Sequence, residues 1–589
     1  MSSEGRSYIY ASRALALILV LVMFLTFFPQ MEASATSVYD DHYVRAALAY
    51  GSNSKSVATL QVASGTGTGF KAGYINPSTD EFKSYYTINK TKVTVIRDYG
   101  MNYNVNSGSY VYDGADGASC VGRWHLEINV DYKNQSELDS AVASAYLATS
   151  YVSFPAFTSS GYRVRIGRFT SESAANEVKA EIQSRLNASS SFAGATVRTV
   201  ASGSNGYTVV EYGTRNILFE WDGASQELAL QATGGTAPET YMSTPTTTST
   251  YRFYGTFDFI SSASTYFSVV NVLPLGTYIR GVVPYELGTS YPEESTKAMA
   301  IIAATFAVYN EGRHSSYGFD VCMGQHCQVY QGIGTSSHRY ETEKIITCCD
   351  AVKGMVITYD KNPIQAVYHS SNGGFTENSE NVWVAALPYL RSVEEKFEQT
   401  TEGATRGQLG IWTTTLTAEQ ITKKLNNKNY SIGTVKSVEV TKRSEAGSVL
   451  ELSISDGSKT VVLEKENMRM VLGTDILLSQ NFKVLHAGSV YVNDGVELGT
   501  GLSGAYVMGA EGVAIPLPDT ARTVLTGSGQ TVVNESSGGA AEWTFDGAGW
   551  GHSLGLCQWG SIGMGRAGYT FDQIIKYYFT GVEISGFDY

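Results

Sequence analysis

The chain has 589 residues, with 42 basic and 55 acidic side chains, and its formal net charge is −13. This acid excess argues against a nucleic-acid-binding protein, which would carry clustered Lys and Arg. Because 43% of the residues are hydrophobic and 16% are charged, the chain can build large cores and is not disordered by composition. Sixty Gly and only 12 Pro, with many Ser, Thr and Tyr, favour strands and turns over helix bundles.

The first 35 residues have the three-part layout of a secretory signal peptide. Arg6 and Arg13 precede an apolar run at 14–28, and Ala-Ser-Ala at 33–35 is a typical cleavage pattern. The run is shorter than the ~20 residues that cross a bilayer as a helix, which favours cleavage over retention as an anchor. We therefore expect an exported protein, located outside the cell, in the cell wall or on the outer face of the membrane.

The remaining chain is predicted to have an α+β fold, rich in strands and with a few helices. Alternating apolar and polar positions predict a strand-rich N-terminal region over 36–155. A strand at 162–169 and an amphipathic helix at 170–186 predict a compact βαβ-like module within 156–233. The other predicted regions are a linker or long loop at 234–250, a mixed region at 251–404, an inserted or accessory β region at 405–540, and a C-terminal part at 541–589 that completes the mixed region.

Glu286 is the main candidate for acid–base chemistry. It lies between an apolar strand that begins near residue 269 and a helix predicted over 292–310. Its neighbours Tyr285 and Leu287 carry no charge, so burial is expected to raise the pKa of the Glu286 carboxyl, as suits a general acid. On residue type alone, an exposed loop carboxylate or a helix cap is the alternative.

A Cys/His cluster provides candidate metal ligands. Cys322, His326 and Cys327, with His314 upstream, supply two sulfurs and two imidazoles, which is enough for a tetrahedral zinc site. Because His326 and Cys327 are adjacent, the backbone must bend for both to bind one ion, and Gly324 is placed to help. A Cys322–Cys327 disulfide is the alternative in an exported chain.

Six motifs in a fixed order make part of the chain resemble a known family. They are Leu273-Pro-Leu-x-x-Tyr-x-x-Gly-Val-Val-Pro-Tyr-Glu286, Lys297-Ala-x-Ala, Asp320-Val-Cys-x-x-x-His-Cys-Gln-Val-Tyr-x-Gly332, His369-Ser-x-x-Gly-Gly-x-Thr-Glu377, Pro388-Tyr-Leu-x-Ser-Val393 and Gly549-Trp-Gly-His-x-x-Gly-x-x-Gln-Trp-Gly560. Together they resemble the stage II sporulation protein D family, also called the amidase-enhancer family, over well under half of the chain.

The resemblance implies a secreted lytic transglycosylase that cleaves the MurNAc–GlcNAc bond of denuded peptidoglycan and leaves a 1,6-anhydro sugar. The essential glutamate of the family falls on Glu286, and some members hold zinc in the Cys/His block. Most glycosidases need two carboxyl groups, but a lytic enzyme can use one, because the C6 hydroxyl of the sugar replaces water. Glu377, Glu380 and Asp546 are the only nearby candidates for a second carboxylate.

Two blocks that contain glycines would contact the glycan in this interpretation. Residues 369–377 predict an Asn-Gly turn between two strands, and residues 547–560 are too rich in Gly for a helix. The alternative for the second block is a tight loop with its tryptophans buried in the core. The predicted substrate-binding residues are Tyr285, His369, Ser370, Ser371, Trp550, His552, Gln558 and Trp559.

Residues 161–212 resemble a SPOR domain, a family that binds glycan strands stripped of their stem peptides. The resemblance depends on the strand Arg-Val-Arg-Ile-Gly-Arg-Phe at 163–169, on the Ser/Ala-rich start of the helix and on the length. A small module without a glycan role is the alternative.

The chain also departs from the family pattern. Met299 and Ala304 stand where the helix usually carries Gln and Arg, and Ala548, Ser553 and Cys557 stand where Arg, Gly and Ser are usual. These departures leave room for a non-catalytic protein that binds glycan and recruits or stimulates a cell-wall amidase. A purely structural wall-binding or coat protein is the third hypothesis.

Overall fold

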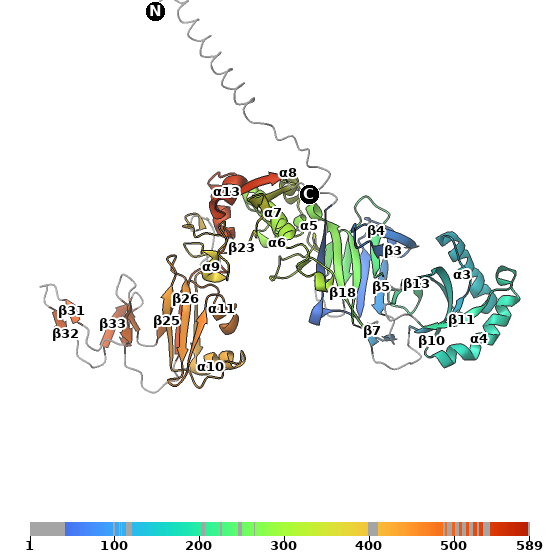
Figure 1. Cartoon of the computed structure of the whole chain (residues 1–589), viewed down its shortest axis with the longest axis horizontal. Helices are drawn as coiled ribbons and strands as arrows, with labels where there is room; N and C mark the ends of the chain where they lie inside the picture. Colours follow the sequence, from blue (N-terminus) through green and yellow to red (C-terminus); the bar gives the residue numbers. More distant parts are fainter. Residues whose placement is uncertain are drawn as a thin grey trace, which may run out of the picture.

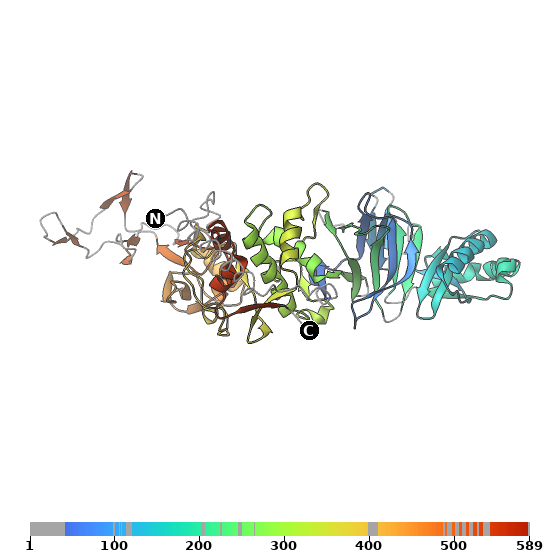
Figure 2. The same cartoon turned by 90° about the horizontal axis from the view of Figure 1, so that it is seen from above.

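The computed structural model describes residues 42–586, apart from 98–100, 105, 108, 113–120, 202–205, 224–225, 245–249, 264, 399–409 and several short gaps between 487 and 541. The predicted signal peptide at 1–35 lies outside the described residues. In the described part, an α+β module, a two-sheet body, a helical region and an accessory β region follow one another in a row (Figures 1 and 2). No helix in this part has both the length and the apolarity for a membrane crossing. The predicted strand-rich α+β class is confirmed.

Two sheets form the central body and share one apolar core. One sheet has the order β19-β1-β18-β17-β14-β3-β4, and the other contains the run β12-β5-β2-β15-β16-β20. Alternate apolar side chains such as Leu60, Phe70 and Val95 are completely buried. The strands are β1 (Tyr43–Ala49), β2 (Val57–Val62), β3 (Gly69–Ile75), β4 (Phe82–Ile88), β5 (Lys92–Arg97), β12 (Tyr207–Glu211), β13 (Ile217–Asp222), β14 (Leu228–Thr233), β15 (Thr240–Ser243), β16 (Tyr251–Phe253), β17 (Thr256–Ala263), β18 (Tyr266–Pro274), β19 (Val321–Cys322) and β20 (Gly334–Thr335), with a small hairpin of β6 (Met101–Asn104) and β7 (Ser109–Tyr112).

Two of the predicted regions differ from this arrangement. The predicted N-terminal region 36–155 is not separate, because β1 pairs antiparallel with β18, from Tyr43 opposite Pro274 onward. The predicted linker at 234–250 contains β15, which pairs with β2 and β16. In both cases an unpaired strand edge would leave backbone groups without partners, so distant segments of the chain satisfy one another.

The α+β module has a β-α-β-β-α-β topology and the strand order β11-β8-β10-β9. The predicted helix over 170–186 is confirmed as α4, and the Ser171 hydroxyl accepts a hydrogen bond from the Ala174 amide at its start. The predicted boundary at residue 156 falls inside β9, so the module begins earlier than predicted. Its elements are β8 (Trp124–Ile128), α3 (Gln135–Thr149), β9 (Ser153–Thr158), β10 (Gly161–Phe169), α4 (Glu172–Asn187) and β11 (Val197–Ala201).

The helical region follows β18 directly. The helix predicted over 292–310 is confirmed as α7, and almost all of its side chains are buried. The helices are α5 (Leu275–Arg280), α6 (Val283–Glu286), α7 (Glu293–Tyr309), α8 (Glu343–Ala351), α9 (Ser379–Val382), α12 (Gln558–Arg566) and α13 (Phe571–Tyr578), and the short strands are β21 (Met355–Tyr359), β22 (Asn362–Pro363), β23 (Tyr368–His369), β36 (Leu556–Cys557) and β37 (Glu583–Gly586).

We predicted that the Gly-rich block at 547–560 contains no helix, and this prediction was wrong for its last residues. Its last residues begin α12, where the Cys557 sulfur accepts a hydrogen bond from the Gly560 amide at 3.3 Å. The glycines of this helix permit close packing, since a Cβ on Gly563 would lie 2.2 Å from the Phe397 carbonyl oxygen. Glycine here therefore reflects tight contact between segments instead of the absence of a helix.

The accessory region has its own apolar core. Its sheet β24-β35-β28 contains β35, which we had assigned to the C-terminal part 541–589, so the accessory region ends later than the predicted residue 540. Its elements are β24 (Trp412–Thr417), α10 (Ala418–Asn426), β25 (Ser437–Arg443), β26 (Val449–Ser455), β27 (Thr460–Glu464), α11 (Asn467–Leu472), β28 (Phe482–His486) and β35 (Glu542–Gly547), with the strand pairs β29 (Ser489–Tyr491) and β30 (Glu497–Thr500), β31 (Tyr506–Met508) and β32 (Ala514–Pro516), and β33 (Arg522–Thr526) and β34 (Gly529–Val533).

Candidate functional site

Glu286 ends α6, the short helix that connects β18 and α5 to the long helix α7. The backbone amide of Val329 donates a 2.6 Å hydrogen bond to Oε1 of Glu286. The Tyr368 hydroxyl, on β23, lies near the carboxyl and lowers its pKa. Gln558, the first residue of α12, donates from Nε2 to the backbone oxygen of Glu286 at 2.8 Å. Residues that are far apart in the sequence thus meet at Glu286, from a loop, a strand and a helix.

Burial and hydrogen-bond donors have opposite effects on the pKa of Glu286. Burial raises the pKa of the Glu286 carboxyl above its ordinary value, while the Val329 amide and the Tyr368 hydroxyl hold the rise back. No basic residue of the described part contributes to the shift. The predicted direction of the shift and its predicted cause, burial without a cationic neighbour, therefore agree with the structure.

Gln328 connects two tyrosines beneath Glu286. Its side chain is completely buried. The Tyr278 hydroxyl donates to Gln328 Oε1 at 3.2 Å, and Gln328 Nε2 donates to the Tyr368 hydroxyl oxygen at 3.5 Å. Sequence reasoning did not select Gln328, Val329 or Tyr368 as functional residues. Their positions inside or beside the Cys/His and His-Ser motifs were the only signal available.

The loop at 369–372 lies against the Gly-rich block. Strand β23 pairs parallel with β36, so that His369 lies opposite Cys557. The Ser370 carbonyl accepts from the Trp559 amide at 3.2 Å, and Ser371 and Trp550 exchange backbone hydrogen bonds. Nδ1 of His369 donates to the Leu554 carbonyl at 3.0 Å, and burial lowers the pKa of this imidazole to about 4. His369 is therefore neutral at physiological pH.

Two buried carboxylates that the sequence analysis missed hold this loop in place. Glu398 accepts from the Ser371 hydroxyl and from the Asn372 amide. Glu395 accepts from the Tyr578 hydroxyl at 2.7 Å. Both carboxylates form hydrogen bonds with residues around them. These bonds connect the loop at 369–372 to the C-terminal helices.

The three carboxylates proposed as a second catalytic group are also engaged elsewhere. Glu377 is buried and accepts from Ser444 of the accessory region at 2.5 Å. Glu380 forms an ion pair with Arg391, and Asp546 accepts from the Thr413 hydroxyl. None of the three is bonded to Glu286 or to the groups around it in the described part of the chain.

The predicted sugar-contacting aromatics have different environments. Trp550 is 49% exposed, whereas Trp559 is partly buried and packs edge-to-face on Tyr291. His552 packs between His369 and Trp383, and burial lowers the pKa of its imidazole to about 3. Tyr285 packs against Tyr340 with ring centroids 5.0 Å apart. Their role in binding stays a prediction.

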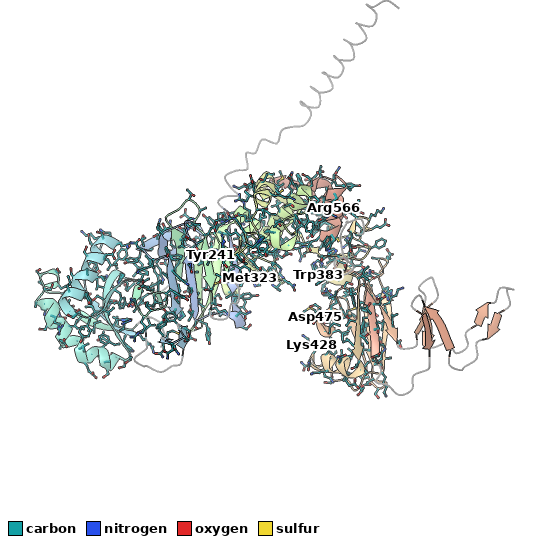
Figure 3. The ribbon with its side chains drawn as sticks, turned by 180° about the vertical axis from the view of Figure 1, so that it is seen from behind. Tyr241, Met323, Trp383, Lys428, Asp475 and Arg566 are labelled. Atoms are coloured by element: carbon teal, nitrogen blue, oxygen red, sulfur yellow. The ribbon has the colours of Figure 1, made fainter. Side chains whose placement is uncertain are left out.

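Trp383 marks the junction with the accessory region. Lys465 donates to the Trp383 carbonyl oxygen at 3.2 Å, and Trp383 lies on the side of the helical region that faces the accessory region (Figure 3). The accessory region therefore adjoins the predicted sugar-contacting residues through Trp383 and His552.

The predicted metal ligands come together in one cluster. Ligand atoms of His314, Cys322, His326 and Cys327 all lie within 4.8 Å of one another. Cys327 Sγ lies 3.3 Å from His314 Nε2 and 3.5 Å from His326 Nδ1, and Cys322 Sγ lies 3.8 Å from His326 Nδ1. Cys322 and Cys327 are free thiols in this structure. A tetrahedral zinc site with bonds of about 2.0–2.3 Å needs ligand atoms about 3.3–3.8 Å apart, and the three separations given above lie in this range.

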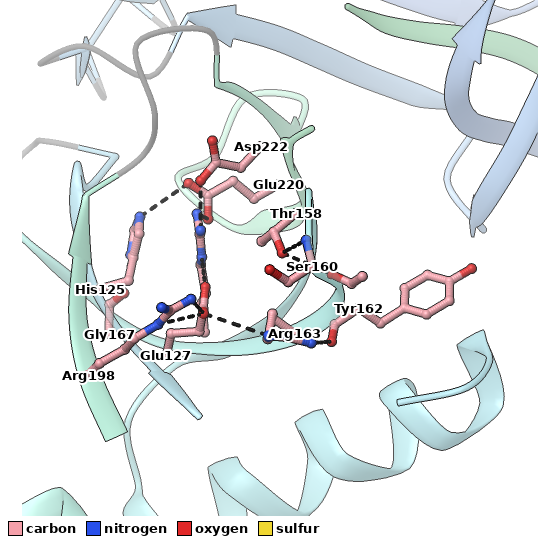
Figure 4. Close-up of polar contacts among 12 residues, drawn as sticks. His125, Glu127, Thr158, Ser160, Tyr162, Arg163, Gly167, Arg198, Glu220 and Asp222 are labelled. Carbon is pink, nitrogen blue, oxygen red and sulfur yellow. Dashed lines mark hydrogen bonds and ion pairs between the residues drawn. The ribbon is translucent and has the colours of Figure 1, made fainter. Parts of the chain in front are cut away.

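The sheet of the α+β module carries a buried charge network on the face opposite its helices. Arg165 is 2% exposed and pairs with Glu127, Glu220 and Asp222 at 3.0, 3.0 and 2.8 Å. Figure 4 shows Glu127 between Arg163 and Arg198. Because these arginines are already paired with carboxylates, the network stabilises the junction between the module and β13. The glycan-binding role predicted for this module stays a prediction.

Comparisons with known proteins match the central part of the chain. Residues 263–359 match the family described as Stage II sporulation protein (SpoIID), and residues 384–502 match a domain of unknown function (DUF8618). The chain is 27% identical over 337 residues to a stage II sporulation protein D of Bacillus subtilis, which covers 54% of this chain and 77% of the relative. It is 25% identical over 323 residues to an amidase enhancer of the same species, covering 52% and 40%, and 24% identical over 334 residues to an uncharacterized protein of Brachyspira hyodysenteriae, covering 56% and 72%.

The first match contains Glu286 and the complete Cys/His cluster. The family resemblance drawn from the ordered motifs is therefore confirmed. Through this region, the chain is similar to the stage II sporulation protein D family and to its named relatives.

Proposed function

We propose that this protein is an exported peptidoglycan lytic transglycosylase, acting on denuded glycan strands with Glu286 as its single acid and base. The observation that carries the proposal is a partly buried carboxyl with a raised pKa, while Glu377, Glu380 and Asp546 are bonded elsewhere. The named relatives support a role in cell-wall remodelling during sporulation.

One carboxyl can perform both proton transfers of this reaction. Protonated Glu286 gives its proton to the glycosidic oxygen as the bond from that oxygen to C1 of MurNAc breaks. The resulting carboxylate then takes the proton of the MurNAc C6 hydroxyl, whose oxygen bonds to C1 and closes the 1,6-anhydro ring. Glu286 is protonated again at the end, and no water is consumed. Burial favours the acid form for the first step, and the Val329 amide and Tyr368 hydroxyl stabilise the carboxylate for the second.

The glycan would contact groups on both sides of the loop at 369–372. Exposed Trp550 suits stacking on a sugar ring, and Ser370 and Tyr285 offer polar groups at the partly buried surface. His369 is neutral and its Nε2 is buried, so it would accept from a sugar hydroxyl only after the loop has moved.

We further propose that the cluster of His314, Cys322, His326 and Cys327 holds zinc. The proposal is supported by the separations between the four ligand atoms and by the free thiols. Zinc would fix the loop that contains Cys327 and, two residues later, Val329, whose amide bonds to Glu286. Zinc would thus hold in place the Val329 amide, which donates a hydrogen bond to the Glu286 carboxyl.

Digestion of purified denuded glycan strands tests the main proposal. The wild-type protein should release anhydro-MurNAc products, which mass spectrometry distinguishes from hydrolytic products because they lack one water. The Glu286→Gln variant should release none while keeping the circular dichroism spectrum of the wild type. Equal release of anhydro products by both proteins would overturn the assignment of Glu286.

A second function, stimulation of a separate cell-wall amidase, is favoured by the relative named amidase enhancer. Met299 and Ala304 of α7 are also buried and apolar. At these positions the chain therefore lacks the polar Gln and the charged Arg that are usual in the resembled family. This function predicts binding to cell-wall sacculi, no anhydro products and a higher rate for an added amidase. The same digestion therefore separates the two functions.

A further inference from the structure

We infer that Gln328 is a positioning residue for Glu286 and acts through the hydroxyl of Tyr368. The inference rests on the proposed function and deepens it, because it explains how one carboxyl is kept in the geometry that both proton transfers require. Gln328 forms no direct hydrogen bond with the carboxyl in the described part of the chain; its effect passes through one hydrogen-bonded neighbour.

Two hydrogen bonds of the Gln328 amide connect the tyrosines beneath Glu286. The buried Tyr278 hydroxyl donates to Gln328 Oε1, on the side of the amide away from Nε2. Gln328 Nε2 donates to the oxygen of Tyr368 at 3.5 Å, which leaves the Tyr368 proton available to the nearby Glu286 carboxyl. A hydroxyl that accepts one hydrogen bond donates a stronger one, since such chains polarise one another.

The backbone brings the same segment to Glu286 a second time. Val329 follows Gln328 directly, and its amide donates to Oε1 of Glu286. Consecutive residues therefore reach the carboxyl by two routes, one through the backbone and one through the Gln328 side chain and Tyr368. Both routes supply donors, and donors stabilise the carboxylate that must take the C6 proton.

Few charged groups oppose this arrangement. The titratable groups that act on Tyr278 are Tyr330, Glu286 and the cysteines 322 and 327, and those that act on Tyr368 are Glu286 and Tyr278. Burial raises the pKa of both Tyr278 and Tyr368 well above the ordinary value, so both hydroxyls keep their protons over the working range. Gln558 faces Glu286 from α12 and is uncharged.

Three variants in the full chain test the inference. Gln328→Leu removes both hydrogen bonds of the amide, and Tyr368→Phe removes only the hydroxyl that contacts Glu286. Tyr278→Phe is the matched control, because it also disturbs a buried hydrogen bond of Gln328 but leaves Nε2 free to donate to Tyr368. The readouts are the pH dependence of kcat and KM on glycan strands and the titration of the Glu286 carboxyl, identified by carbon-13 NMR as the glutamate signal absent from Glu286→Gln.

We expect Gln328→Leu and Tyr368→Phe to lower kcat with little change in KM. We also expect both to move the carboxyl titration upward, by about one pH unit for Tyr368→Phe, because a hydrogen bond to the charged form is lost. Tyr278→Phe should leave the titration midpoint in place, even where it lowers thermal stability as much as Gln328→Leu does. This comparison separates positioning from folding.

The outcomes also separate this inference from the proposed function. An unchanged Glu286 titration in both Gln328→Leu and Tyr368→Phe would overturn the inference, whether or not the wild type cleaves glycan. A shifted titration in a protein that releases no anhydro products would keep the positioning role and reject the transglycosylase. An equal shift in Tyr278→Phe would show a general structural effect and would also overturn the inference.

Discussion

The amide of Val329 lies 2.6 Å from Oε1 of Glu286, only two residues after Cys327 of the Cys/His cluster. The proposed metal site and the proposed acid are therefore joined by a very short piece of backbone. Any movement of the cysteine loop is transmitted to a donor of the carboxyl. This relationship gives the cluster a consequence for chemistry as well as for stability.

The first prediction concerns stability against pH. Glu286 has a raised pKa in the folded protein, so folding loses stability as pH rises from the ordinary value of 4.5 through the folded-state pKa, where a buried charge must form. Glu286→Gln keeps an oxygen for the Val329 amide and carries no charge. We expect the variant to have a higher Tm than the wild type at neutral pH and the same Tm near pH 3. Calorimetry at both pH values measures this, and a constant difference at the two would contradict it.

The second prediction concerns the cluster. The purified protein should contain about one zinc per chain by metal analysis, and Cys322→Ser should contain much less. Removal of the metal should lower Tm, because the ion binds the folded state and not the unfolded chain.

Cys348→Ser is the matched control for this experiment. Cys348 is equally buried but lies outside the cluster, on α8. It should keep the full metal content. If the purified protein contains no metal and has a Cys322–Cys327 disulfide, the disulfide is favoured over the zinc site.

The third prediction concerns the attachment of the accessory region. Ser444→Ala removes the donor to Oε2 of Glu377 and leaves a buried carboxylate oxygen without that partner. The free energy of unfolding should fall by about 1–3 kcal/mol. Urea denaturation measures the loss, and Ser458→Ala, at an exposed turn, should change it by less than about 0.5 kcal/mol. Equal values for the two variants would rule out an anchoring role for Ser444.

The fourth prediction concerns the charge network of the α+β module. Glu127→Gln leaves buried Arg165 with one carboxylate fewer and removes the partner of Arg198. We expect a loss of about 3 kcal/mol in the free energy of unfolding, because breaking a buried pair leaves an uncompensated charge. Glu177→Gln on the exposed face of α4 is the control. If both variants unfold at the same urea concentration, the network contributes no net stability.

Local patterns predicted the local elements well. The helices around Ala174 and Ile301 follow from amphipathic spacing and caps, and the structure confirms them as α4 and α7. Glu286 could be selected because an apolar strand and a helix enclose it. The Cys/His cluster could be selected because its ligands lie close together in the sequence.

Contacts between distant segments could not be predicted in the same way. The pairing of β1 with β18 and the bond between Ser444 and Glu377 join residues that no local pattern relates. Tyr368 and Gln328 were missed for the same reason, since their importance depends on the fold that brings them beneath Glu286. Gly563 of α12 shows that glycine content alone does not distinguish a loop from a closely packed helix.

Strand β1 has a consequence for the order of events during export. It would be among the first segments to emerge on the far side of a membrane, yet its partner β18 emerges only after the whole α+β module. Until then, the sheet beside Glu286 stays incomplete. Because Val329, Tyr368 and Gln558 also reach Glu286, the site of the proposed exported enzyme would be complete only after residue 558 has crossed the membrane.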